Sequence, residues 1–327
     1  MCRLLLIISH AQVDPCPQLK WDRIAETQRT KLIQTRWDSP KYLYALGGLG
    51  NDDEALSCVE RFDVGTGGWE PMPPMSVARY AHGAGVVSGQ VYVVGGYNEE
   101  GNPLSHAERY DDEKRRWEAV ASMSCARYAL GVCVLDDRLY AVGGYDAKYR
   151  KLSSCEVYDA VSDSWQPMAP MSSARSYHGV AVLDGRLYAV GGFDENDVTL
   201  SSVERYNPAD NSWEAVAPMS CSRGGLGVAV LDGLLYAVGG RYDNNNLLSS
   251  MERYDPSSDR WQAVRSMSTP RRFCSVGVLE GHLYVVGGKD TEGNRLSTVE
   301  RYDPGTDSWE AVEAMSQARC DLGLTVL

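Results

Sequence analysis

Hydrophobic and polar positions along this chain follow a pattern that is typical of short, paired β-strands. Residues 177–183 and 186–190 form two mostly apolar runs, each about as long as an ordinary strand. Between them stand Asp184 and Gly185, a pair that a tight two-residue hairpin turn favours. The pattern therefore predicts an antiparallel hairpin.

The second strand of this hairpin runs into a pair of glycines, Gly191 and Gly192. A polar loop, 193–200, comes next. A third strand is expected at 202–206, and a short fourth strand is expected near Trp213. The stretch therefore predicts a unit of four short strands.

This unit occurs six times at a constant spacing of 48 residues. The first glycine of each pair marks it, at Gly47, Gly95, Gly143, Gly191, Gly239 and Gly287. A tryptophan keeps the same spacing, at Trp69, Trp117, Trp165, Trp213, Trp261 and Trp309. Four strands in a unit of roughly 40–50 residues are typical of a propeller blade. We therefore predict an all-β, six-bladed propeller with four antiparallel strands per blade.

The two ends of the repeat predict how the ring closes. The pattern begins at Tyr42 with a second strand and ends at 320–327 with a first strand. Pairing 320–327 with the first blade would remove two exposed sheet edges, so we expect a closed propeller over 41–327. Residues 1–40 lie outside the repeat. We expect an N-terminal extension that is partly helical or disordered, either a linker or the remnant of another domain.

Composition narrows the class of partner. The chain has 327 residues and a net charge of −12, without the clustered Lys and Arg of a nucleic-acid-binding surface. Its apolar run at 4–8 is too short to cross a bilayer. Nine cysteines lack the paired spacings of a disulfide framework or a zinc site. We therefore expect reduced thiols, a cytoplasmic location, and neither nucleic-acid nor membrane binding.

Three features of the unit together resemble the Kelch repeat: the glycine pair, an aromatic residue seven positions before the tryptophan, and Met-x-x-x-Arg after it. The stretches 201–219 and 297–315 are similar to the propellers of BTB-Kelch ubiquitin-ligase adaptors. This resemblance covers 41–327 and implies a propeller that recognises substrates for a cullin-based ligase. Members of that family carry BTB and BACK domains before the propeller, and 1–40 is too short for either. We expect cullin engagement only if the full-length product carries a BTB domain.

Residues that recur in all six units are expected to stabilise the structure of the blade. The recurring aromatic residues, which we interpret as packing between neighbouring sheets, are Phe62, Tyr110, Tyr158, Tyr206, Tyr254 and Tyr302. The recurring arginines are Arg79, Arg127, Arg175, Arg223, Arg271 and Arg319, and the recurring glutamates are Glu60, Glu108, Glu156, Glu204, Glu252 and Glu300. Because an unpaired buried charge is costly, we predict a repeated ion pair or carbonyl clamp within or between blades.

Two sets of loops differ from unit to unit, as a site for one partner would. One set follows the glycine pairs, at 49–56, 97–104, 145–152, 193–200, 241–248 and 289–296, and the other follows the repeated arginines. The Kelch resemblance implies that both sets lie on one face and form the partner site. Arginines beside aromatic rings are typical of binding hot spots. The predicted partner-binding residues are Tyr80, Tyr97, Tyr128, Tyr145, Lys151, Tyr177, Phe193, Arg241, Arg272, Phe273, Lys289 and Arg295.

Charge divides these loops. Loops 49–56, 97–104 and 193–200 are acidic, whereas 145–152 is net positive. The fifth and sixth units carry a basic arc that suits carboxylates or phosphates on a partner. The basic arc consists of Arg241, Arg272, Lys289 and Arg295.

Catalysis is the weaker interpretation of this sequence. A copper oxidase needs several histidine and tyrosine ligands that converge on one site, and the chain has five histidines. His82 and His178 occupy the same position two blades apart, and we interpret them as first-strand residues that line or cap the central channel. No GxSxG nucleophile elbow occurs. We predict no catalytic residues, no metal and no cofactor.

The leading hypothesis is a protein-interaction module that captures a short partner segment, a ubiquitin-ligase substrate, on its loop face. The alternative is a cytoskeletal Kelch propeller that binds actin or an actin-associated protein. A galactose-oxidase-like copper enzyme is the remote third hypothesis.

Overall fold

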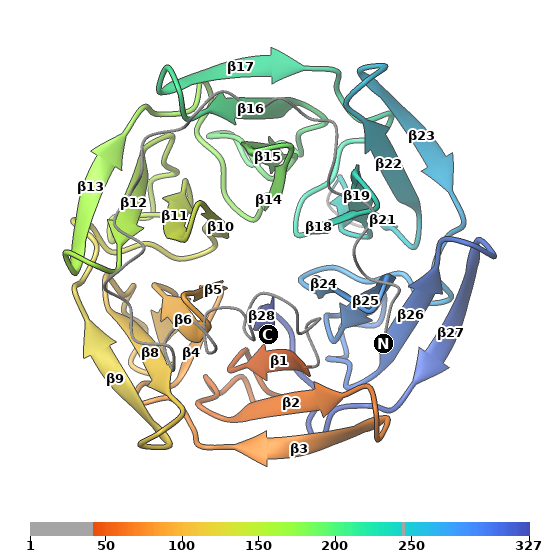
Figure 1. The fold of residues 1–327 in the computed structure, drawn as a ribbon. Coiled ribbons are helices and arrows are strands. Elements are labelled where there is room, and N and C mark those ends of the chain that lie inside the picture. The colour runs from red at the N-terminus through yellow and green to blue at the C-terminus, as the bar shows by residue number, and fades with distance from the viewer. Residues whose placement is uncertain (1–41, 244–245) are drawn as a thin grey trace, which may run out of the picture. The chain divides into compact units, whose positions relative to one another are not determined.

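Six four-stranded antiparallel sheets surround a common axis, as the blades of a propeller do (Figure 1). The structure, a computed structural model, describes residues 42–243 and 246–327. It confirms the predicted fold class, the six blades and the four strands in each. The predictions for 1–40 lie outside the described residues. In the described ranges, no helix is long and apolar enough to cross a membrane.

Each blade runs from an innermost strand at the axis to an outermost strand at the rim (Figure 1). The first blade contains β28 (Gly323–Val326), β1 (Tyr42–Leu46), β2 (Val59–Asp63) and β3 (Gly68–Met72). The second contains β5 (Gly83–Val87), β6 (Gln90–Val94), β8 (Ala107–Asp111) and β9 (Arg116–Val120). The third contains β10 (Gly131–Leu135), β11 (Arg138–Val142), β12 (Cys155–Asp159) and β13 (Ser164–Met168).

The last three blades follow the same order. The fourth contains β14 (Gly179–Leu183), β15 (Arg186–Val190), β16 (Val203–Asn207) and β17 (Ser212–Val216). The fifth contains β18 (Gly227–Leu231), β19 (Leu234–Val238), β22 (Met251–Asp255) and β23 (Arg260–Val264). The sixth contains β24 (Ser275–Leu279), β25 (His282–Val286), β26 (Val299–Asp303) and β27 (Ser308–Val312). Two short ladders lie outside the blades: β4 (Arg79–Tyr80) with β7 (Tyr97–Asn98), and β20 (Arg241–Tyr242) with β21 (Asn246–Leu247).

The hairpin turns follow from residues that tolerate a left-handed backbone. Asp184 and Gly185 have φ values of 50° and 69°, the type I′ geometry of the tight two-residue turn that was predicted. The second strand of this hairpin, β15, begins and ends as predicted. The first, β14, begins two residues later than predicted, because Tyr177 has a φ of 49° and leaves the extended conformation.

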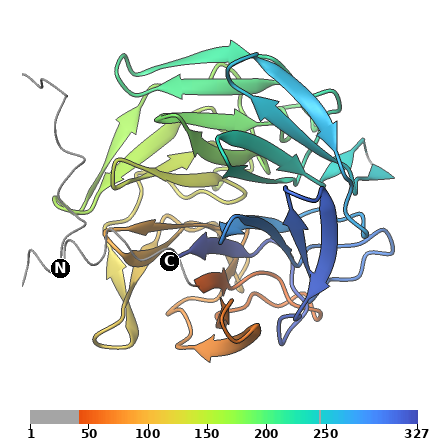
Figure 2. The ribbon, with the colours of Figure 1, turned by 45° about the vertical axis from the view of Figure 1, so that its right-hand side comes forward.

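The C-terminal strand closes the ring, as predicted. β28 pairs antiparallel with β1, and Figure 2 shows this dark blue strand entering the red and orange blade. The amide of Tyr42 donates to the carbonyl oxygen of Leu327 at 2.9 Å, and the amide of Leu327 donates back at 3.0 Å. The regular strand is shorter than the predicted 320–327, because Asp321 has a φ of 53°.

The glycine pairs stand where two chain segments touch. Gly191 has a φ of +60°, and a Cβ atom there would lie 2.5 Å from the carbonyl oxygen of Arg223. Gly192 has a φ of +93°, and its Cβ would lie 2.6 Å from the carbonyl oxygen of Ser176. Only glycine combines this backbone with so close an approach. The pair therefore belongs to the scaffold, as predicted.

Aromatic side chains join neighbouring blades. Each of six hydrophobic clusters takes its residues from two adjacent blades. In one of them, the rings of Tyr188 and Tyr254 lie 5.9 Å apart across the blade boundary. The indole Nε1 of Trp261 donates to the carbonyl oxygen of Ala217 in the preceding blade at 2.9 Å. The same bond is made by Trp69, Trp117, Trp165, Trp213 and Trp309.

The recurring arginines and glutamates form buried clamps, which confirms the predicted ion pair and carbonyl contacts. Arg175 donates from Nη1 to the carbonyl oxygens of Gly191 at 3.0 Å and Ser202 at 2.9 Å, and from Nη2 to Glu204 at 3.0 Å. The other carboxylate oxygen of Glu204 accepts the amide of Ser172 at 2.7 Å, which fastens the connection from the preceding blade. The six pairs are Arg79–Glu108, Arg127–Glu156, Arg175–Glu204, Arg223–Glu252, Arg271–Glu300 and Arg319–Glu60.

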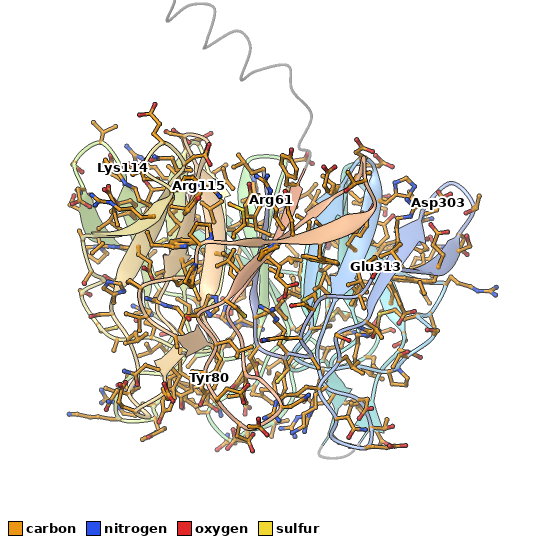
Figure 3. All side chains as sticks on the ribbon, turned by 90° about the horizontal axis from the view of Figure 1, so that it is seen from below. Arg61, Tyr80, Lys114, Arg115, Asp303 and Glu313 are labelled. Carbon is orange, nitrogen blue, oxygen red and sulfur yellow. The ribbon has the colours of Figure 1, made fainter. Side chains whose placement is uncertain are left out.

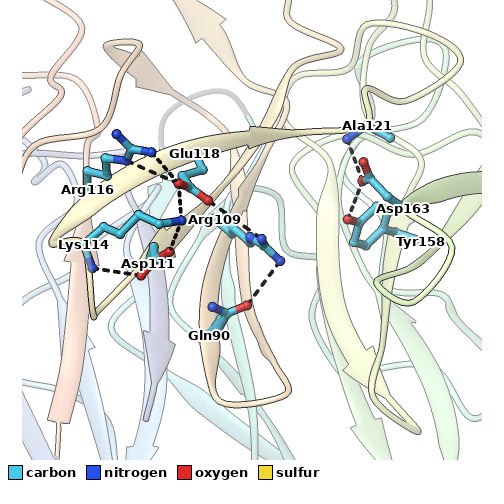
Figure 4. Close-up of polar contacts among 9 residues, drawn as sticks. All are labelled: Gln90, Arg109, Asp111, Lys114, Arg116, Glu118, Ala121, Tyr158 and Asp163. Atoms are coloured by element: carbon cyan, nitrogen blue, oxygen red, sulfur yellow. Dashed lines mark hydrogen bonds and ion pairs between the residues drawn. The ribbon is translucent and has the colours of Figure 1, made fainter.

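The second blade lacks a polar contact that other blades share. In the third blade, Asp163 accepts hydrogen bonds from the Tyr158 hydroxyl at 2.7 Å and from the Ala121 amide at 2.9 Å (Figure 4). Arg115 holds this position in the second blade, with a φ of 53°. The buried Tyr110 hydroxyl finds no hydrogen-bond partner within the described ranges. This blade therefore carries a defect that one substitution can repair.

We expect Arg115→Asn to raise the free energy of unfolding by about 1 kcal/mol. Asparagine tolerates the left-handed backbone, and its oxygen would accept the Tyr110 hydroxyl. Asn211 already does this for Tyr206 in the fourth blade, at 2.9 Å. Urea denaturation of the wild type and the variant measures the gain.

The matched control for this prediction is Arg116→Asn. Arg116 is the neighbouring exposed arginine, and it donates to Glu118 at 2.9 Å (Figure 4). Its loss should not stabilise the protein, because this ion pair is exposed to solvent. An equal gain from both variants, or none from Arg115→Asn, would contradict the role given to Tyr110.

Candidate functional site

The two variable loop sets lie together and pair with each other. The residue after each repeated arginine forms a short antiparallel bridge with a residue that follows a glycine pair. The six bridges are Tyr80–Tyr97, Tyr128–Tyr145, Ser176–Phe193, Gly224–Arg241, Arg272–Lys289 and Cys320–Leu49. In Figure 3, Tyr80 lies at one end of the blades, whereas Lys114 and Arg115 lie at the other. We call the surface formed by the bridged loops the loop face.

Six backbone hydrogen bonds form a closed ring at the centre of the loop face. The residue two positions after each repeated arginine has a φ between 49° and 66°. Its amide donates to the carbonyl oxygen of the equivalent residue in the preceding blade, at 2.7–2.9 Å. These residues, which we call the hub ring, are Ala81, Ala129, Tyr177, Gly225, Phe273 and Asp321. Because the bonds use backbone atoms alone, the side chain here is free to differ between blades.

Aromatic side chains form a continuous chain across the loop face. Tyr128 stacks on Tyr145 with ring centroids 4.9 Å apart. At the axis, the rings of Tyr177 and Phe273 lie 4.8 Å apart. In order, the chain consists of Tyr80, Tyr97, Tyr128, Tyr145, Tyr177 and Phe273, with Phe193 beside Tyr177. The structure thus brings together all seven aromatic residues of the predicted site.

Burial corrects the prediction that these aromatic residues are exposed. Phe193 is only 3% exposed, because its ring fills the place that a side chain at Gly224 would occupy. The other six are half-buried. Two exposed tyrosines lie in the variable loops: Tyr149, whose hydroxyl lies 2.8 Å from that of Tyr97, and Tyr242. Sequence reasoning missed both because, among the aromatic residues of these loops, it considered only those directly after a glycine pair.

Ion pairs neutralise two of the five predicted cations. Lys151 pairs with Asp197 and is almost fully covered, and Arg295 pairs with Asp53. The basic arc is therefore narrower than predicted. Within 42–243 and 246–327, its remaining members have no carboxylate at ion-pair distance. These members are Arg241, Arg272 and Lys289.

Arg241 and Arg272 each lie over an aromatic ring. The guanidinium carbon of Arg241 lies 4.6 Å from the ring centroid of Phe193, and that of Arg272 lies 5.1 Å from the centroid of Phe273. Burial lowers the pKa of Arg241, and the positive charge of Arg272 lowers it further. Because arginine stays protonated at neutral pH, the two residues present positive charge, and no carboxylate of the described ranges pairs with it. Such a pair favours an anionic group.

A cavity of about 110 Å³ lies at the axis beside the hub ring. His82 and His178 line it, which confirms their predicted place at the channel, although both precede the first strand of their blade. Both are buried, and their ring nitrogens have no hydrogen-bond partner among the described residues. Burial lowers the pKa of both imidazoles to about 3, so they are neutral at physiological pH. In the part of the chain that the structure describes, no group of three His, Cys, Asp or Glu is placed to hold a metal ion.

Sequence reasoning also missed Asp321, which lines the same cavity. Asp321 stands two positions after Arg319, as Tyr177 and Phe273 stand after their arginines. The prediction took only aromatic residues at this position. The signal was present in the sequence, because this position varies between blades and Asp321 is its one charged member.

Comparison with known proteins identifies the repeat. A family model described as the KLHDC2/KLHL20/DRC7 Kelch-repeats domain matches residues 35–223, more than half of the chain. A Kelch motif model matches 222–268 and 270–316. The chain belongs to the Kelch-repeat family. Kelch propellers are protein-interaction modules that bind proteins or peptides and are typically not enzymes.

The solved structure described as "Structure of YjhT" shares the fold of this Kelch propeller. It matches with a TM-score of 0.71 at 13% sequence identity, covering 84% of this chain and 99% of its own. At so low an identity the likeness concerns the fold alone.

Proposed function

We propose that this Kelch propeller captures a short, extended segment of a partner protein on its loop face. It would act as the substrate-recognition part of an adaptor for a cullin-RING ubiquitin ligase. The observation that carries the proposal is the place of Arg241 and Arg272 against two rings of the aromatic chain. In this patch, two cations that have no ion-pair partner among the described residues lie against the buried ring of Phe193 and the half-buried ring of Phe273.

The chemistry of this patch favours a segment that carries an acidic group beside an apolar side chain. Guanidinium groups bind carboxylates and phosphates through paired, charge-assisted hydrogen bonds. Tyrosine rings offer a large contact area, and little conformational entropy is lost when they bind. Lys289 adds a third cation, because its backbone is bridged to that of Arg272. An acidic and apolar segment therefore fits better than a basic one at this end of the loop face.

The ligase part of the proposal has separate support. The stretches 201–219 and 297–315 resemble the propellers of BTB-Kelch adaptors, and cullin engagement would require a BTB domain in the full-length product. We also propose a cytoplasmic location. The seven cysteines of the described ranges are free thiols, as expected in a reducing compartment.

Peptides selected from a random library on the immobilised wild-type protein should be enriched in Asp and Glu. For the tightest of them, we expect Arg241→Ala/Arg272→Ala to raise the Kd at least about tenfold, because each charge-assisted hydrogen bond contributes roughly 1.5–3 kcal/mol. Tyr145→Ala should also weaken binding, through loss of stacked ring surface. Fluorescence anisotropy with labelled peptides measures both effects.

Lys114→Ala is the matched control, because it removes a cation at the opposite end of the blades (Figure 3). Its Kd should equal that of the wild type. Unchanged affinity in both the arginine double variant and Tyr145→Ala would contradict the assignment of the site.

The cytoskeletal alternative makes a different prediction. A propeller that binds actin would co-sediment with actin filaments without any added peptide. If the wild-type protein co-sediments with actin and the arginine double variant does not, actin binding would replace the ligase proposal. The loop face would remain the binding site.

A further inference from the structure

The axial cavity takes no part in the proposed contact with an acidic group. It is lined by the six hub-ring residues and by the residue that follows each of them. Because a water occupies about 30 Å³, a cavity of about 110 Å³ has room for a few waters or for the end of one long side chain. It is therefore a candidate subsite for one side chain of a partner segment.

The cavity offers one negative charge. The Asp321 carboxylate accepts a hydrogen bond from the Cys320 thiol at 3.3 Å. In the described ranges, no Lys or Arg nitrogen lies within ion-pair distance of it. His82 and His178 also line the cavity, but their ring nitrogens are covered: a side chain at Gly323 would meet Nε2 of His82, and one at Gly131 would meet Nε2 of His178. The Asp321 carboxylate is therefore the group that the cavity offers to a cation.

The loop face of the first four blades suits a cation. Aromatic ring faces attract ammonium groups, and Lys151 already lies 5.2 Å from the ring centroid of Tyr145. Three loops of this region, 49–56, 97–104 and 193–200, are acidic, whereas 145–152 is net positive. The loop face of the first four blades is therefore mostly acidic and aromatic. In the fifth and sixth blades, Arg241, Arg272 and Lys289 have no carboxylate of the described ranges at ion-pair distance.

Burial, opposed by nearby charges, sets the pH at which Asp321 is ionised. Burial raises the pKa of its carboxyl group to about 7, and the Cys320 thiol and nearby cations oppose that rise. The titratable and charged groups that face it are Tyr80, Tyr177, Arg272, Lys289, Arg295 and Cys320. Arg295 is already paired with Asp53, and the guanidinium of Arg272 lies over Phe273. The carboxyl group therefore gains its negative charge as the pH rises through neutrality.

We propose that the axial cavity binds the ammonium group of a lysine side chain, with Asp321 as its counter-ion and the rings of Tyr177 and Phe273 in the cavity lining. The proposal rests on the proposed function, because it places this lysine in the same captured segment. That segment would carry an acidic group for Arg241 and Arg272 and a lysine for the cavity. A lysine is specified because its flexible alkyl stem and compact ammonium group suit a cavity of about 110 Å³ with one carboxylate in its lining.

The probe n-butylammonium, a lysine side chain without its backbone, tests the cavity without any partner. In amide NMR titrations of the full chain, we expect saturable shifts at hub-ring amides such as that of Ala129. The affinity should rise about tenfold from pH 6 to pH 8, because the ionised fraction of a carboxyl group with a pKa of about 7 grows from about one eleventh to about ten elevenths. Asp321→Asn should weaken binding and abolish the pH dependence. Asparagine keeps the side-chain shape and tolerates the backbone of this position.

Further probes and a second variant separate the possible outcomes. Butanol and butyrate should not bind, and propylguanidinium should bind more weakly than butylammonium. His178→Leu, which introduces the residue found at the equivalent Leu130, should leave the affinity for butylammonium and its pH dependence unchanged, because the ring nitrogens of His178 are covered. Equal binding of butylammonium to Asp321→Asn, or preferential binding of butyrate, would overturn the proposal. Because these titrations use no peptide, they fail or succeed independently of the capture of acidic peptides.

Discussion

Replacing Arg175 by methionine should lower the free energy of unfolding by about 3–5 kcal/mol. The guanidinium of Arg175 is 1% exposed, and its partner Glu204 is 3% exposed. Methionine fills most of the volume but leaves the Glu204 carboxylate buried without its counter-ion. The carbonyl oxygens of Gly191 and Ser202 also lose their donor. Guanidinium denaturation of the purified variant measures the loss.

A surface arginine of the same blade provides the control. Arg186 pairs with Glu214 where both side chains are substantially exposed, so Arg186→Met should change the stability by less than about 1 kcal/mol. The double variant Arg175→Met/Glu204→Leu should recover part of the loss, because it removes the stranded charge. A single Arg175 variant as stable as the Arg186 control would contradict the clamp as a main support of the blade.

Thr325→Pro should open the ring and destabilise the protein by about 3 kcal/mol or more. Thr325 of β28 stands opposite Tyr44 of β1. The pair Tyr42–Leu327 exchanges both backbone hydrogen bonds, and such pairs alternate along an antiparallel ladder. Thr325 therefore donates its amide to β1, and proline removes that donor from the strand that closes the propeller. The expected result is a lower denaturation midpoint together with association through the freed edge of β1.

Thr325→Val keeps the shape and the amide of this position, so it should behave as the wild type does. Size-exclusion chromatography and denaturation of the two variants distinguish ring opening from a local packing change. A monomeric Thr325→Pro protein of wild-type stability would contradict closure by β28.

The loop face was predictable in its position and much less so in its accessibility. The variable positions beside the glycine pairs and after the arginines come together, because every blade is folded alike. Whether a residue there is exposed depends on the neighbouring blade. Phe193 is buried because the next blade has glycine at Gly224, and no pattern within the Phe193 blade indicates that.

The charge that the loop face offers to a partner was also only partly predictable from the sequence. The sequence counts cations in each loop, but a cation binds a partner only if no carboxylate of its own chain holds it. Lys151 and Asp197 are 46 residues apart in sequence, and Arg295 and Asp53 are 242 residues apart. These distances close only because adjacent blades stand side by side around the ring. Arg295 of the predicted basic arc is therefore already paired, and Arg241 and Arg272 are the main candidates for binding an anionic group.

The sequence by itself determined the scaffold of this protein, because every blade repeats the same short-range requirements. Turn residues, apolar runs and glycine pairs recur every 48 residues, and the unpaired strands at the two ends of the repeat required closure. Only the tertiary structure decided the chemistry at the axis. Asp321, His82 and His178 belong to different blades. They line one cavity because the backbone hydrogen bonds of the hub ring join the six blades around a common axis.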